Sequence, residues 1–127
     1  ILDGCLVRKD QRADVFDYFN NQLGYRVLFI ECTCDDDLAL ERNYQEVIRY
    51  SADYKGMDPA AAAEDLKRKV AHYVIAYEPL VENYPRITFD TVKMDIRAHK
   101  VLGHVETSVI GYLGSVTTKP HTLYFSR

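Results

Sequence analysis

The segment from Tyr25 to Ile48, "YRVLFIECTCDDDLALERNYQEVI", decides the predicted fold because its pattern changes from strand to helix within a few residues. Tyr25–Cys32 is an apolar run rich in β-branched and aromatic residues, which predicts a strand covered on both faces. A helix is predicted to begin near Asp35–Asp37, where acidic residues suit a helix N-terminus. The apolar face of this helix would carry Leu40, Tyr44, Val47 and Ile48.

Strands and helices alternate along the rest of the chain. The other predicted elements are the end of a short buried strand at Ile1–Leu2, a helix over Asp10–Leu23 stopped by Gly24, a helix from Asp58–Pro59 to Pro79, a strand over Arg86–Val92, a helix with Ala98, Val101, Val105, Val109 and Tyr112 inward, and a strand over Thr122–Ser126. This order predicts an α/β domain with a mostly parallel sheet and flanking helices. Four strands are few for such a sheet, so we expect residues 1–127 to be a portion of a larger domain.

Composition excludes several classes of protein. A net charge of −3 over 127 residues gives no electrostatic footprint for nucleic acid. Without an apolar run near the ~20 residues of a membrane span, no membrane association is expected. Three cysteines cannot form a disulfide framework, which favours a reducing, cytoplasmic location. Cys32 and Cys34 have C-x-C spacing, which is unlike paired zinc ligands, so no metal site is predicted among them.

Polar clusters are predicted at the carboxyl ends of strands, where ligands bind in parallel α/β sheets. They are Asp3-Gly4-Cys5, Glu31-Cys32-Thr33-Cys34-Asp35 and Asp90-Thr91. Asp3 could hold Mg²⁺ through water or accept a proton from an attacking hydroxyl, or it could be a turn residue before Gly4. Cys34 could be a thiolate at a helix N-terminus or a small buried thiol.

Other polar residues have ordinary structural interpretations. Cys32 is expected in the core, and Tyr73 is expected in the core with its hydroxyl near a rim. Asn43 and Glu46 would form a solvated helix face, as would Lys67-Arg68-Lys69. The chain contains no G-x-x-x-x-G-K-[ST] phosphate loop and no G-x-S-x-G or H-E-x-x-H motif.

Several segments, in order, resemble the kinase domain of the bifunctional 6-phosphofructo-2-kinase/fructose-2,6-bisphosphatase family. The segments that carry the likeness are "ILDGCLVRKDQR", "FIECTCDD", "NYQEV", "SADY", "EDLKRKVAHYVIAYEPL" and "YLGSVTTKPHTLYFSR". Each is similar to a family motif, the second to F-[VI]-E-S-x-C-D-D and the fifth to D-F-x-x-R-I-x-x-Y-x-x-x-Y-x-P-L. The likeness extends over essentially all 127 residues.

The resemblance implies a P-loop nucleoside-triphosphate fold related to the nucleotide kinases, acting on ATP, Mg²⁺ and fructose 6-phosphate to regulate glycolysis. It implies that Asp3 is the catalytic carboxylate and that Cys34 takes the place of the active-site cysteine in a positional role. The residues on its ATP-contacting stretch are Asn43, Tyr44, Gln45, Glu46, Val47 and Ile48. The phosphate loop and its strand would lie upstream of Ile1, so this chain alone is expected to be inactive and to bind no cofactor tightly.

Two departures from the family concern its other sites. The 127 residues contain no H-G-E motif, so no phosphatase chemistry is assigned to them, although a phosphatase domain is expected in the family's longer proteins. The positions that match the family's sugar-phosphate ligands are Cys5, Gln11, Ile48, Lys69 and Tyr73, of which only Tyr73 is identical. Lys9, Arg12 or Arg49 could replace the lost cations. Otherwise, the longer protein would be a P-loop kinase that acts on another substrate, such as a nucleotide or polyol, or a degenerate, non-catalytic kinase-like domain. A missing sheet strand would also expose an edge and favour self-association.

Overall fold

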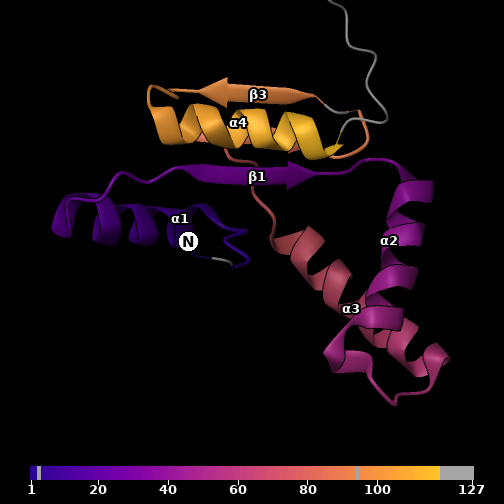
Figure 1. Cartoon of the computed structure of the whole chain (residues 1–127). Coiled ribbons are helices and arrows are strands. Elements are labelled where there is room, and N and C mark those ends of the chain that lie inside the picture. The colour runs from indigo at the N-terminus through magenta and orange to yellow at the C-terminus, as the bar shows by residue number, and fades with distance from the viewer. Residues whose placement is uncertain (3, 94, 118–127) are drawn as a thin grey trace, which may run out of the picture. The chain divides into compact units, whose positions relative to one another are not determined.

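The computed structural model describes residues 1–117 apart from residues 3 and 94 (Figure 1). The elements are α1 (Lys9–Phe16), η1 (Asp17–Gln22), β1 (Phe29–Thr33), α2 (Asp37–Tyr50), η2 (Ala52–Tyr54), α3 (Pro59–Ala76), β2 (Arg86–Asp90), β3 (Ile96–His99) and α4 (His104–Thr117). They form two compact units, residues 1–27 with 35–83 and residues 28–34 with the described part of 84–127. The described chain is therefore mixed α/β, with a helical unit and a sheet unit.

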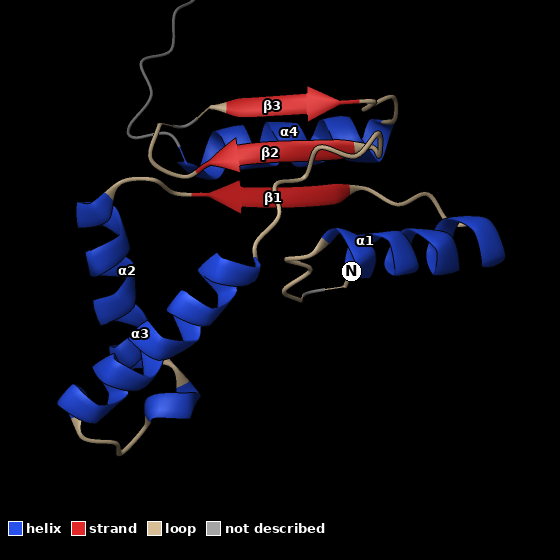
Figure 2. Ribbon diagram, turned by 180° about the vertical axis from the view of Figure 1, so that it is seen from behind, coloured by secondary structure: helices blue, strands red, loops and turns tan. Residues whose placement is uncertain are grey.

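The sheet unit contains the three described strands in the order β1-β2-β3 (Figure 2). β1 pairs with β2 in parallel, and β3 pairs with β2 antiparallel. The register sets Phe89 opposite both Cys32 and Ile96, so these residues share one face. α4 lies along this face, since a Cβ on Gly114 would meet Ile96 Cδ1 at 4.0 Å. Ile87 and Phe89 are buried and form the core of this unit.

The edge of β1 away from β2 has no partner among the described strands. The Phe29 N–H donates to Pro85 O, and Thr33 O accepts from the Thr91 N–H, both at 3.0 Å. Backbone groups of alternate residues point in opposite directions along a strand, so those of Ile30 and Cys32 face the free edge. Both side chains are exposed, Ile30 at 48%.

The helical unit begins and ends its helices at residues typical of caps. The Asp36 side chain accepts a hydrogen bond from Ala39 N at 2.7 Å at the start of α2. Asp58 caps α3 in the same way, with Pro59 at the first helical position. Gly24, at a φ of 73°, follows η1 and terminates the first helical segment. α2 packs against α3, and the helix starts predicted at Asp35–Asp37 and at Asp58 are confirmed.

Several predictions about strands are wrong. Ile1 and Leu2 are exposed and form no strand, because no neighbouring strand pairs with them in the described chain. β1 begins at Phe29 rather than Tyr25, and it is not covered on both faces. Cys32 is exposed rather than buried in the core.

The region after β2 also differs from the prediction. Ala98 lies in β3 and pairs with Ile87 of β2, so it is part of a strand and not of the fourth helix, which begins only at His104. Because β3 is antiparallel to β2, the sheet is mixed rather than mostly parallel. Val105 and Tyr112 are exposed rather than inward, at 70% and 65%. The strand predicted over residues 122–126 lies outside the described residues. None of the described helices is long and apolar enough to cross a membrane.

Candidate functional site

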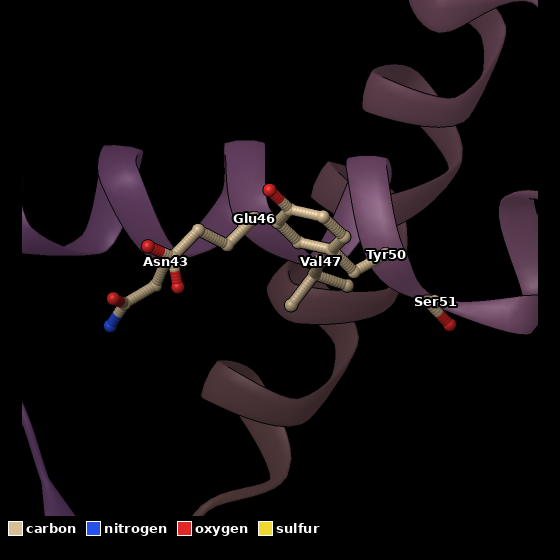
Figure 3. Close-up of a pocket in the computed structure, with 5 residues that line it drawn as sticks. All are labelled: Asn43, Glu46, Val47, Tyr50 and Ser51. Carbon is tan, nitrogen blue, oxygen red and sulfur yellow. The ribbon is translucent and has the colours of Figure 1, made fainter.

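A surface hollow of about 460 Å³ lies on the C-terminal half of α2. Its lining residues are Asn43, Glu46, Val47, Tyr50 and Ser51 (Figure 3). Residues 43, 46, 47 and 50 follow the i, i+3, i+4, i+7 spacing of an α-helix, so they lie together on one face over two turns. The hollow lies entirely within the helical unit.

The hollow combines an apolar surface with two polar groups. In Figure 3 the Glu46 side chain extends along the helix toward Asn43, whose amide group points away from Glu46, and the Tyr50 ring lies along the helix beside Glu46. Val47 and Tyr50 are 41% and 73% exposed, which leaves their apolar surface available to a ligand. A flat ring can pack against such a surface while an amide and a carboxylate bond its polar edge. This arrangement can bind and orient a ligand.

The end of α2 is fixed by the turn that follows the helix. The Ser51 N–H donates to Val47 O at 2.9 Å, and Ser51 Oγ accepts from Asp53 N at 3.3 Å, which starts η2.

The other residues predicted to contact ATP do not line the hollow. Tyr44 and Ile48 are half-buried and lie outside the hollow lining. The side chain of Gln45 donates to Glu41 Oε1 at 2.9 Å. Half of the six residues predicted to contact ATP therefore line the hollow.

Tyr50 and Ser51 line the hollow but were not among the predicted site residues. Tyr50 could have been found by continuing the helical spacing from Asn43 through Val47 by one more step. Ser51 carries no such pattern, because it lies just beyond the last helical residue.

Lys69, predicted to bind the sugar phosphate, belongs to a cluster around Asp65. Its Nζ lies 2.8 Å from Asp65 Oδ2 and 5.1 Å from the centre of the Tyr54 ring. Arg68 bonds the other carboxylate oxygen at 2.7 Å, and the Tyr54 hydroxyl donates to Oδ2 at 3.2 Å. These bonds, from Lys69 first and Arg68 next, lower the pKa of Asp65 to about 2. Asp65 and Tyr54 in turn raise the pKa of Lys69, so its positive charge is secured.

Tyr73 follows Lys69 by four residues, so the two lie on the same side of α3. Its side chain is 45% exposed, so the prediction of a core residue is wrong. The Tyr73 ring contacts His72 edge-on at 5.9 Å between centroids. Lys69 and Tyr73 are thus both accessible to a ligand on that side of the helix.

The remaining predicted site residues lie in separate places. Cys5 is an exposed free thiol, and Cys34 is a half-buried one in the connection between β1 and α2. Gln11 Oε1 accepts from Arg8 N at 3.1 Å and so helps to begin α1. Asp3 lies outside the described residues.

Two other sequence candidates have structural roles. Asp90 accepts bonds from Lys93 N and Val92 N, which lower its pKa and form the turn after β2. Arg12 is buried and ion-paired, so it cannot replace a lost sugar-phosphate ligand as the sequence suggested. Within residues 1–2, 4–93 and 95–117, no group of three or more potential metal ligands occurs.

The class of the protein follows from the similarity of its sequence to a known family. The family model for 6-phosphofructo-2-kinase matches residues 1–120. The chain therefore belongs to the 6-phosphofructo-2-kinase family, which confirms the resemblance seen in the sequence.

Curated relatives cover the whole chain. It is 35% identical over 133 aligned positions to a 6-phosphofructo-2-kinase/fructose-2,6-bisphosphatase of Gallus gallus, and 32% identical over 132 to one of Caenorhabditis elegans. It is 28% identical over 131 to 6-phosphofructo-2-kinase/fructose-2,6-bisphosphatase 4 of Homo sapiens. All of this chain is aligned in each case, and it spans 28%, 29% and 28% of the length of those relatives.

Proposed function

We propose that residues 1–127 are the C-terminal portion of a P-loop kinase domain in a longer 6-phosphofructo-2-kinase. That longer protein would transfer the γ-phosphoryl group of ATP to the 2-hydroxyl of fructose 6-phosphate. Family membership supports this reaction, and the names of the relatives support a fructose-2,6-bisphosphatase elsewhere in the longer protein. Because these 127 residues contain no phosphate-loop motif, the proposal assigns the triphosphate cradle to residues outside them. The three free cysteines fit a cytoplasmic location.

The observation that carries this proposal is the hollow on α2. Asn43, Glu46 and Val47 were assigned to ATP contact by resemblance, and all three line it. We assign the hollow to the base of the nucleotide, whose ring would pack on Val47 and Tyr50. Asn43 and Glu46 would then bond the polar edge of the base.

Mg²⁺ would supply charge neutralisation at the transferring phosphates. It is usually held by one or two carboxylates together with phosphate oxygens and water, so a single protein ligand such as Asp3 fits this role. Phosphoryl transfer passes through a loose transition state that depends on placement and charge. Cys34 is therefore proposed as a positional residue and not as a nucleophile.

Nucleotide binding can be tested on the isolated chain by NMR with ¹⁵N-labelled protein and Mg²⁺-ATP. We expect amide shifts at Asn43, Glu46, Val47 and Tyr50 at millimolar nucleotide. Val47→Asp should abolish them. Val74→Asp, an exposed position on α3 at 68%, is the matched control and should leave them unchanged. Shifts confined to other residues, or none, would refute the assignment of the hollow.

The reaction itself needs the longer protein. We expect that protein to phosphorylate fructose 6-phosphate, Asp3→Asn to abolish turnover, and the isolated 127 residues to show none. Turnover by the isolated chain would contradict the proposed division of the site.

A degenerate, non-catalytic domain is the second candidate, and the surroundings of the predicted sugar-phosphate residues favour it. Gln11 is uncharged and bonds Arg8, while Lys69 is already ion-paired with Asp65. Arg12 is buried and cannot compensate. A calorimetric titration of the longer protein with fructose 6-phosphate separates the two candidates. Micromolar affinity would exclude the degenerate domain, and absence of binding would favour it.

A further inference from the structure

Arg12 is a buried cation that joins two segments far apart in the sequence. Its Nε donates to Glu82 Oε1 at 2.8 Å, and the two side chains are 4% and 7% exposed. Its terminal nitrogens donate to four backbone carbonyls, those of Leu6, Val7, Glu78 and Pro79, at 3.0–3.3 Å.

The backbone of the same two segments is joined independently of Arg12. Glu78 N donates to Val7 O at 2.8 Å, and Lys9 N donates to Glu78 Oε2 at 2.6 Å. Residues 6–12 and 78–82 therefore form one hydrogen-bonded unit, which we call the Arg12 latch. Buried carbonyls need partners, and a guanidinium with several N–H groups serves many acceptors at once.

The latch adjoins the predicted sugar-phosphate residues on both sides. Cys5 directly precedes the carbonyls of residues 6 and 7, and Gln11 directly precedes Arg12. The carbonyls of residues 78 and 79 follow the end of α3, which carries Lys69 and Tyr73. Without a tie between these segments, Cys5 and Gln11 would be free to move relative to α3.

We propose that Arg12 is a positioning residue: through Glu82 and the four carbonyls it fixes the segment with Cys5 and Gln11 relative to the α3 residues of the sugar-phosphate site. The Arg12 side chain itself touches no ligand. The link to the sugar phosphate rests on the function proposed above, whereas the latch geometry does not.

Arginine is required here because of its shape as well as its charge. The planar guanidinium reaches Glu82 and carbonyls from two segments, whereas the compact ammonium of lysine has only three donors. Burial tends to raise the pKa of Glu82, but the hydrogen bond and charge of Arg12 outweigh this and leave the pKa lowered. Glu82 is therefore ionised at neutral pH, and removing Arg12 would leave its charge buried and unpaired.

Electron paramagnetic resonance can measure this positioning directly. One nitroxide is placed on Cys5 and a second on Lys67→Cys, at an exposed α3 residue, with Cys32→Ser and Cys34→Ser in every sample. We expect a narrow distance distribution for the reference chain and a broad one for Arg12→Met. Arg12→Lys should give intermediate width. Arg8→Met is the matched control, because Arg8 lies in the same segment but is 54% exposed, and it should keep the narrow distribution.

Circular dichroism and thermal melting show whether each variant is folded. If Arg12→Met does not fold, Arg12→Lys, which keeps the charge but loses the planar fork, decides by the same measurement. A distribution in a folded Arg12→Met or Arg12→Lys chain as narrow as the reference overturns the proposal.

A kinetic measurement in the longer protein separates positioning from general stability. Hydrogen bonds weaken steeply when donor and acceptor are misplaced, so a shift of Cys5 and Gln11 relative to α3 would weaken binding of the sugar phosphate. Arg12→Lys should therefore raise KM for fructose 6-phosphate and leave KM for ATP unchanged, and equal changes in both would contradict the positioning role. If the unmodified longer protein binds no fructose 6-phosphate, the proposed function fails. The nitroxide distances would still show whether Arg12 holds its segment in place relative to α3.

Discussion

The ammonium of Lys69 lies 2.8 Å from Asp65 Oδ2, an oxygen that also accepts the Tyr54 hydroxyl at 3.2 Å. The pKa of Asp65 is lowered to about 2, chiefly by Lys69 and then by Arg68. A lowered pKa in the folded state means that this carboxylate stabilises the fold above its ordinary pKa of 3.8. We predict that the contribution is lost as the pH falls from about 4 through about 2. Titration of the Asp65 carboxyl carbon by NMR should give a midpoint near 2.

Substitutions of the partners of Asp65 should raise its pKa, by most for the partner that lowers it most. Lys69→Met should raise it most, Arg68→Met less, and Tyr54→Phe least, because Tyr54→Phe removes only a hydroxyl. The same carboxyl carbon titration measures all three variants, with Lys67→Met as a control on the same helix. An unchanged midpoint in Lys69→Met would show that the ion pair does not form in solution.

Two glycines should respond oppositely to alanine. Gly24 has a φ of 73°, a conformation that costs an L-residue about 1–2 kcal/mol, so Gly24→Ala should destabilise the chain by about that amount. Gly111 lies inside α4 with no atom within 4 Å of an added Cβ, so Gly111→Ala should stabilise it by about 0.5–1 kcal/mol. Urea denaturation measures both. Destabilisation by Gly111→Ala would mean that α4 packs more closely there than the structure shows.

Restoring a cation at Gln11 should strengthen sugar-phosphate binding by the longer protein. A hydrogen bond to a charged group contributes about 1.5–3 kcal/mol, so Gln11→Arg should raise affinity for fructose 6-phosphate by about tenfold or more. The cost is the bond from Arg8 N to Gln11 Oε1, which the variant loses. Gln22→Arg, at an exposed position of η1 where the glutamine likewise makes one side-chain hydrogen bond, adds the same charge elsewhere and should have no effect. Calorimetry measures both variants, and equal gains would indicate non-specific attraction.

The helix starts were predictable because their determinants are local. Asp58 and Pro59 favour a helix start through local contacts, since the Asp58 side chain bonds N–H groups only two and three residues away. The Arg12 latch was not predictable, because Glu82 is 70 residues away and no pattern in the sequence pairs them. A buried arginine also looks like any surface arginine until the carbonyls around it are known.

Residues near β3 show a second limit of prediction from the sequence. Ala98 and Val101 fit a helical spacing, but Ala98 pairs with Ile87, so sheet pairing overrode local periodicity. In the hollow, helical periodicity groups Asn43, Val47 and Tyr50 on one face, yet it cannot tell whether that face is covered. The sequence therefore predicted where this helix begins, and only the structure showed that part of its face forms a hollow.

Self-association is the last prediction, and it follows from the edge of β1 that has no partner among the described strands. The backbone groups of Ile30 and Cys32 face away from β2, and an unpaired edge promotes pairing with a second chain. We predict that the isolated chain forms dimers or larger species in sedimentation at micromolar concentration under reducing conditions. Ile30→Lys should shift it to monomer, because a charged side chain at the edge opposes pairing.

The control for this effect is Ile75→Lys, which removes the same apolar side chain and adds the same charge at a position on α3 that is 87% exposed. It should leave the sedimentation profile of the parent chain unchanged, because it does not alter the strand edge. Dimers that persist in Ile30→Lys but disappear in Ile75→Lys would place the contact on α3. A chain that is monomeric before any substitution, and unfolds cooperatively, would show that the β1 edge is protected in solution.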